Sequence, residues 1–144
     1  MSGLNVSIAN FFNSVSKSNM KKPCEDFYDP AAVFEDPMVK LEGRDKLISY
    51  YTRLYDNVLK IQFDVTSEIS VGDETYARWT MHLNHKRLNG GKKISVDGSS
   101  YVRSRDGKAI FHRDYFDLGS MLYENIPGFG ALTKLVRGFA AGSH

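Results

Sequence analysis

The chain has 144 residues, enough for one domain with a buried core and too few for two. An apolar fraction of 42% and a charged fraction of 25% are typical of a soluble globular protein. The formal net charge is only +2, and the 19 Lys and Arg residues are spread along the chain, which argues against a nucleic-acid partner. We therefore expect a single domain over residues 1–144.

The cysteine count and the apolar segments of the sequence indicate the cellular compartment of the protein. The only cysteine, Cys24, excludes an internal disulfide and favours a reducing environment. No Cys/His spacing suits a metal, and we expect no organic cofactor. The start of the chain lacks the apolar run of a signal peptide, and no window approaches the roughly 18 apolar residues of a membrane span. These features favour a cytoplasmic protein that uses neither metal nor membrane.

Helical spacing of apolar residues predicts three helices before the main sheet. The first helix carries Leu4, Ile8, Phe11, Phe12 and Val15. Pro23 suits a first helical turn, so a short second helix is expected over 24–28, and a short strand over 31–36 closes at Pro37. The third helix carries an apolar stripe of Leu47, Ile48, Tyr51, Leu54, Tyr55 and Val58.

From Leu59 onward the apolar period becomes two, which is typical of strands. A turn at 71–73 and the turn pairs at 89–90 and 106–107 divide this region into four consecutive antiparallel strands. One face is more apolar than the other, so we expect the helices to cover it. Apolar alternation places Trp79 and Met81 on that face, whereas a shifted register would place Arg78 and Thr80 there.

A closing helix is predicted after the last strand. A breaker cluster at 126–130 precedes an apolar stripe of Leu132, Leu135, Val136 and Phe139. Because such a stripe must be buried, we expect residues 122–139 to cover the open end of the fold. Bending at the breaker cluster would let this cover move as a lid.

Residues 106–117 put ionisable groups into a predicted buried strand. If 109–118 is one strand, Ile110, His112, Asp114 and Phe116 share one face. A buried imidazole two residues from a buried carboxylate is costly unless the groups are paired or used. This face is the first candidate for chemistry, and the alternative is a hydrogen-bonded pair that only stabilises the sheet.

The order of elements, with Phe-Glu-Asp-Pro at 34–37 and Arg-Asp-Tyr-Phe-Asp at 113–117, resembles the nuclear-transport-factor-2-like superfamily. The resemblance covers nearly the whole chain. This superfamily includes ketosteroid isomerases, SnoaL-like polyketide cyclases and limonene-epoxide hydrolases. It implies an α+β cone, in which a curved, mixed and mainly antiparallel sheet wraps around helices and encloses a pocket. Such a fold does not fix function by itself.

The ketosteroid isomerases place a general base in a similar Glu-Asp-Pro turn, which Asp36 matches, although Asp before Pro is also a common turn pair. They also need two strong donors, and this chain offers Phe12 and Ser99 at the matching places. Asp97 lies two residues from Ser99, and a bulge at Gly98 would aim it toward the pocket. Steroid isomerisation by that mechanism is therefore not expected.

The other two enzyme groups point to the last strand. Limonene-epoxide hydrolases activate water with an aspartate that Asp114 matches, but neither register around Trp79 supplies their second aspartate. SnoaL-like cyclases use a last-strand aspartate with less fixed partners, and Asp114 beside His112 fits that pattern. The resemblance implies that Asp114 exchanges a proton, that His112 orients it, and that Asp36 or Asp97 adds a second polar contact.

The implied ligand is a small apolar molecule with a ring, because aromatic side chains would line the pocket. Besides Asp97 and Ser99, the residues expected to contact it are Tyr101, Trp79, Met81, Phe116 and Phe12. The leading hypothesis is a cofactor-independent isomerase, cyclase or hydrolase. The alternative is a non-catalytic module that binds an apolar ligand or dimerises. We also expect a homodimer through the outer face of the sheet, which carries Tyr76, Thr80 and Tyr115.

Overall fold

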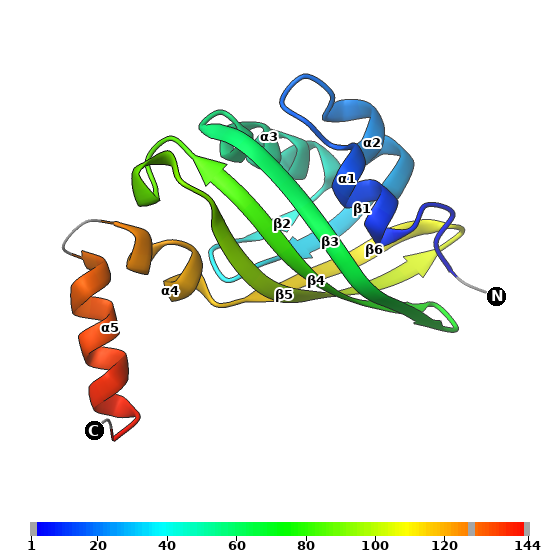
Figure 1. Cartoon of the computed structure of the whole chain (residues 1–144). Helices are drawn as coiled ribbons and strands as arrows, with labels where there is room; N and C mark the ends of the chain where they lie inside the picture. The colour runs from blue at the N-terminus through cyan, green and yellow to red at the C-terminus, as the bar shows by residue number, and fades with distance from the viewer. Residues whose placement is uncertain (1–2, 127–128, 143–144) are drawn as a thin grey trace.

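The computed structural model describes residues 3–126 and 129–142, and these form an α+β fold (Figure 1). Within them, a six-stranded curved sheet has the order β2-β1-β6-β5-β4-β3. The strands are β1 (Tyr28–Glu35), β2 (Lys40–Glu42), β3 (Val58–Val71), β4 (Glu74–His85), β5 (Ile94–Arg105) and β6 (Lys108–Phe116). The helices are α1 (Ile8–Ser14), α2 (Lys21–Phe27), α3 (Arg44–Tyr55), α4 (Leu118–Met121) and α5 (Phe129–Ala140), with single 3₁₀ turns η1 (Asn89–Gly91) and η2 (Tyr123–Asn125).

The sheet is mixed and mainly antiparallel, as expected. Strands β3 to β6 form a meander, and β1 joins β6 in parallel with Phe34 opposite His112. Strand β2 pairs antiparallel with β1 at the edge. The turn between β5 and β6 places Asp106 and Gly107 at positive φ, 52° and 85°, a backbone state that these residue types tolerate. The predicted fold class is confirmed.

Helices α1 to α3 pack on the concave face of the sheet and close the core (Figure 1). Helix α1 begins at Ile8 because the Ser7 hydroxyl accepts a hydrogen bond from the amide of Asn10 at 3.0 Å. The carboxylate of Glu68 on β3 accepts two more, from the amides of Ile8 at 2.8 Å and Ala9 at 3.0 Å. These bonds satisfy the free N–H groups of the first turn and fasten α1 to β3.

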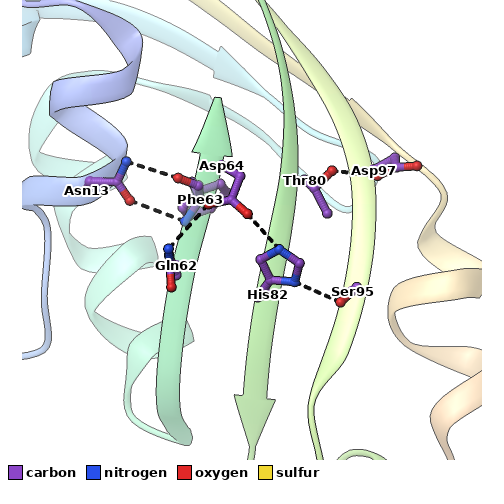
Figure 2. Close-up of polar contacts among 8 residues, drawn as sticks. All are labelled: Asn13, Gln62, Phe63, Asp64, Thr80, His82, Ser95 and Asp97. Carbon is purple, nitrogen blue, oxygen red and sulfur yellow. Dashed lines mark hydrogen bonds and ion pairs between the residues drawn. The ribbon is translucent and has the colours of Figure 1, made fainter. Parts of the chain in front are cut away.

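The side chain of Asn13 occupies the free edge of β3 (Figure 2). Its amide donates to the carbonyl of Phe63 at 3.1 Å and accepts from the Phe63 N–H at 3.2 Å. A primary amide thereby takes the place of a neighbouring strand at this residue. Strand β3 is an edge strand whose polar backbone is partly covered by α1.

The register of β4 follows the apolar alternation. Trp79 and Met81 are buried on the concave face, while Thr80 faces outward. Gly98 on β5 lies opposite Trp79, and a Cβ atom there would lie 2.3 Å from Cη2 of the indole. Glycine is therefore needed at this position because the tryptophan ring rests on the backbone.

The prediction that the apolar stripe of α5 covers the open end of the fold is wrong. Helix α5 extends away from the sheet (Figure 1), and its contacts are mainly with η2. The side chains of the stripe are exposed, Phe139 to 87%. An ion pair of 2.6 Å between Arg137 and Glu124 ties α5 to the short turn before it. Leu122, at the start of the predicted cover, packs against the core together with the preceding Met121.

Candidate functional site

A cavity of about 220 Å³ lies between the concave face of the sheet and the helices. Most of its wall is aromatic or aliphatic, and the described polar residues on it include Asp36 and Asp114. Six of the residues predicted for the site line this cavity: Asp114, Asp36, Trp79, Met81, Phe116 and Phe12. His112 lies directly behind the wall and is fully buried. The cone encloses a pocket, as the resemblance implied.

The imidazole of His112 joins two polar groups. Its Nε2 atom lies 2.5 Å from Oδ1 of Asp114, and its Nδ1 atom lies 2.6 Å from the hydroxyl of Tyr28. The Tyr28 hydroxyl lies 3.0 Å from that of Tyr51, which stands on the cavity wall. Parallel pairing of β1 with β6 and the packing of α3 on β1 bring these groups together.

A second set of hydrogen bonds reaches Asp114 from β5. The hydroxyl of Ser100 donates to Oδ1 of Asp114 at 2.6 Å, and the indole N–H of Trp79 donates to the same hydroxyl at 2.9 Å. Ser100 and Tyr28 were not among the predicted site residues, and Tyr28 was expected at the end of a helix. The apolar alternation Ile94, Val96 gave the signal for Ser100, because continuing it by twos reaches residue 100.

A continuous chain of hydrogen bonds leads from Tyr51 to Asp114. When Nε2 of His112 donates to Asp114, its Nδ1 atom can accept from Tyr28, which in turn can accept from Tyr51. Burial raises the pKa of Tyr28 and of Tyr51 well above the ordinary value, so both phenols stay protonated. All donors then point toward Oδ1 of Asp114, while Oδ2 accepts no hydrogen bond from the described residues.

Asp36 is both a turn residue and part of the cavity wall. Its Oδ1 atom accepts from the amides of Met38 at 2.7 Å and Val39 at 2.9 Å, which forms the turn between β1 and β2. Its Oδ2 atom accepts from the hydroxyl of Tyr50 at 2.7 Å. Burial, followed by this hydrogen bond and by the charges of Asp36 and Asp114, raises the pKa of Tyr50. Asp36 can therefore stabilise the turn and line the cavity at the same time.

Three predicted contact residues lie on the wrong side of the sheet. Asp97 and Ser99 are exposed on the outer face, where Asp97 accepts from the Thr80 hydroxyl at 2.7 Å (Figure 2). Tyr101 also faces outward and donates to Glu74 at 2.7 Å, and this hydrogen bond, followed by burial, raises its pKa to about 12. The expected bulge is absent, since the pairing of β5 shows no register shift at Gly98. Regular alternation therefore keeps Asp97 outside.

The outer face carries a further row of polar contacts that crosses three strands (Figure 2). His82 lies 2.9 Å from Oδ2 of Asp64 through Nε2 and 2.8 Å from the hydroxyl of Ser95 through Nδ1. Although the residue types are those of a hydrolytic triad, the row lies on the convex surface of the sheet and lines none of the cavity. These cross-strand pairs tie β3, β4 and β5 together.

The family comparison covers most of the fold. A model of the SnoaL-like domain matches residues 8–112. The chain belongs to the SnoaL-like family. The match ends two residues before Asp114, so it spans Asp36 and His112 but does not include Asp114 itself. It confirms the resemblance to the nuclear-transport-factor-2-like superfamily.

Known relatives agree with this assignment. An uncharacterised PhzA/B-like protein of Pseudomonas aeruginosa is 27% identical over 119 residues, which cover 78% of this chain and 83% of the relative. A protein of ketosteroid isomerase-like fold from Catenulispora acidiphila, solved in complex with trimethylamine, has a TM-score of 0.68 at 14% identity, covering 81% of this chain and 93% of that one. An epoxide hydrolase of M. tuberculosis, described as LEH-like, has a TM-score of 0.63 at 17% identity, covering 77% and 76%. These solved structures share the fold.

No group of three or more His, Cys, Asp or Glu side chains among the described residues is placed to hold a metal ion. No helix within 3–126 or 129–142 is long and apolar enough to cross a membrane.

Proposed function

We propose that this SnoaL-like domain binds a small apolar molecule with a ring and moves a proton on it with Asp114, as a cofactor-independent isomerase, cyclase or hydrolase. One observation carries the proposal. Within the described part of the chain, both hydrogen bonds to Asp114 end on Oδ1, and these residues leave Oδ2 of this cavity-wall carboxylate available to a ligand. A general base needs such an oxygen within reach of the proton that it removes.

The other predicted residues take supporting roles in this proposal. His112 does not reach the cavity wall and acts as a positioning residue, because its Nε2–H fixes the rotamer of Asp114. The Tyr28 hydroxyl holds the imidazole in the required tautomer through Nδ1. Asp36 supplies a second polar contact, while Phe12, Trp79 and other rings bury the apolar part of the ligand.

The elimination of 5-nitrobenzisoxazole tests this role directly. A base removes the C3 proton of this compound, the N–O bond breaks, and the phenolate that forms is measured by its absorbance. We expect the wild-type protein to turn over the compound and the Asp114→Asn variant to lose at least about a hundredfold in kcat/KM, the usual contribution of a positioned base. Asp97→Asn is the matched control, because it removes an equal charge from the outer face. Equal rates for wild type and Asp114→Asn would refute the assignment.

Binding without catalysis is the second candidate function. The cavity wall favours it, because an apolar enclosure holds a ligand whether or not chemistry follows. The Catenulispora neighbour, which holds trimethylamine, also supports a small-molecule site in this fold. A ligand that raises the thermal midpoint of the protein, with no turnover and no effect of Asp114→Asn, is the result that favours this candidate.

We also propose a homodimer that uses the outer face of the sheet. Tyr76 and Tyr115 are about half exposed there, close to the exposed side chains of Ile69 and Val71 on the same sheet. Exposed apolar groups of this size are typical of an interface. Light scattering should give twice the chain mass of 16.3 kDa, and Tyr76→Glu should shift the protein toward that single-chain mass. A wild-type monomer at high concentration contradicts the proposal.

A further inference from the structure

The described wall of the cavity is acidic and contains no Lys or Arg side chain. Its carboxylates belong to Asp36 and Asp114. The basic side chain among the described lining residues is that of His85, and burial, with the charge of Arg87, lowers its pKa and favours the neutral ring. The described lining residues therefore supply two acids and no fixed positive charge.

Neither carboxylate has a Lys or Arg partner within the described residues. Asp36 accepts from one phenol and two backbone amides, and Asp114 accepts from Ser100 and His112. None of these donors is a Lys or Arg side chain, so neither carboxylate has a partner with a fixed positive charge among the described residues. Negative charge in an apolar enclosure is costly unless a countercharge accompanies it, so this cavity favours a cationic ligand.

The negative charge of Asp114 affects the pKa values of several tyrosines around the cavity. The pKa values of Tyr28, Tyr50, Tyr51 and Tyr55 are raised chiefly by burial, and the negative charge of Asp114 contributes to each rise. Two of these phenols, Tyr51 and Tyr55, stand on the wall itself. The electrostatic effect of one carboxylate thus reaches several sides of the same enclosure.

Aromatic rings make up a large part of the remaining wall. The described rings are those of Phe11, Phe12, Phe34, Tyr51, Tyr55, Phe63, Trp79 and Phe116. The faces of such rings carry negative potential and attract ammonium groups, which is the basis of aromatic cages. Alkyl groups on the same cation are also compatible with the apolar surface.

We propose that the ligand of this cavity is a small organic cation, an alkyl- or arylalkylammonium whose charged nitrogen lies against Oδ2 of Asp114 and whose apolar part packs among the rings. The cavity volume of about 220 Å³ suits a molecule with one ring, because an apolar cavity of about 150 Å³ already admits benzene. The inference rests on the proposal that this cavity is the functional site, and it adds the charge class of the ligand.

Three probe molecules of nearly equal size but different charge test whether binding depends on the charge of the ligand or on its shape. They are benzyldimethylamine, which is protonated at neutral pH, its neutral carbon counterpart isobutylbenzene, and the anion phenylacetate. Binding is measured by the fluorescence of Trp79, the only tryptophan of the chain and a wall residue. We expect the cation to bind at least about tenfold more tightly than isobutylbenzene, and phenylacetate to bind more weakly than either, because a close charge pair in a poorly solvated site has this effect.

Variants assign the preference to the cavity. Asp114→Asn should weaken benzyldimethylamine by roughly tenfold and change isobutylbenzene by less than about twofold, since only the charge is removed. Asp97→Asn makes the same change in net charge on the outer face and should affect neither probe. Equal or tighter binding of isobutylbenzene to the wild-type protein overturns the inference, and so does an equal loss of cation binding in both variants. The wild-type comparison decides even if Asp114→Asn does not fold.

The two proposals fail separately. If neutral 5-nitrobenzisoxazole is turned over in a way that depends on Asp114, but the cation is not preferred, the cation inference is refuted. The proposal that Asp114 is a general base then stands. If the cation is preferred, Asp114→Asn abolishes that preference and no turnover is seen, the general-base proposal is refuted. The cation site then stands. Absence of binding by all three probes at saturating concentrations refutes both the cation inference and the ligand site on which it rests.

Discussion

Replacing Ser100 with Ala removes one hydroxyl that takes part in a buried hydrogen bond with Trp79 and a partly buried one with Asp114. The indole N–H of Trp79 loses its acceptor at 2.9 Å, and Oδ1 of Asp114 loses a donor at 2.6 Å. An orphaned buried donor costs about 1–3 kcal/mol, and a hydrogen bond to a carboxylate contributes about 1.5–3 kcal/mol. Water in the cavity can reach Asp114 and recover part of the second loss. We expect the free energy of unfolding to fall by about 2–4 kcal/mol.

The assay is thermal unfolding followed by circular dichroism and by Trp79 fluorescence. For a chain of this length, 1 kcal/mol corresponds to about 3–5 °C, so the midpoint should fall by roughly 6–20 °C. Ser99→Ala is the matched control, because Ser99 is exposed on the outer face and should leave the midpoint within about 1 °C. If Ser100→Ala is as stable as Ser99→Ala, the two bonds do not hold the site and the hydrogen-bond chain described above is wrong.

Two further changes test other parts of the fold. Gly98→Ala places a Cβ atom 2.3 Å from the Trp79 ring, so urea unfolding should show a loss of about 1–3 kcal/mol, and a loss below about 0.5 kcal/mol would contradict this packing. Burial raises the pKa of the Cys24 thiol from 9.0 to about 12, and the folded state therefore holds a proton that the unfolded state releases above about pH 9. Stability should fall as the pH rises from about 9 to 12, with Tyr28 and Tyr51 adding to the fall, and a thermal midpoint that stays constant to about pH 11 would refute this.

Much of the fold could be predicted because its strands are long and their turns are marked. Apolar alternation in β4 placed Trp79 and Met81 inside, and the pair Asp106-Gly107 marked a turn that the structure confirms. His112 and Asp114 were found because ionisable groups are unusual in a buried strand. Their predicted pairing is present at 2.5 Å.

The errors in the site have different physical origins. Asp97 and Ser99 were placed in the pocket by the family resemblance, whereas the apolar alternation of β5 puts them on the outer face and Ser100 inside. The hydrogen bond between Tyr28 and His112 depends on the parallel pairing of β1 with β6, a long-range register that no local spacing reveals. For α5, the apolar stripe was recognised, but a stripe indicates that a helix needs a partner without indicating which surface supplies it.

The amide of Asn13 has a consequence for how copies of this sheet can associate. It occupies the outward N–H and C=O groups of Phe63, the groups that an added strand would use to extend the sheet beyond β3. With α1 fastened along the same margin through Glu68, β-augmentation is blocked on that side. A continuous intermolecular sheet through β3 is therefore disfavoured, and side-to-side polymerisation through this margin requires that α1 first detach.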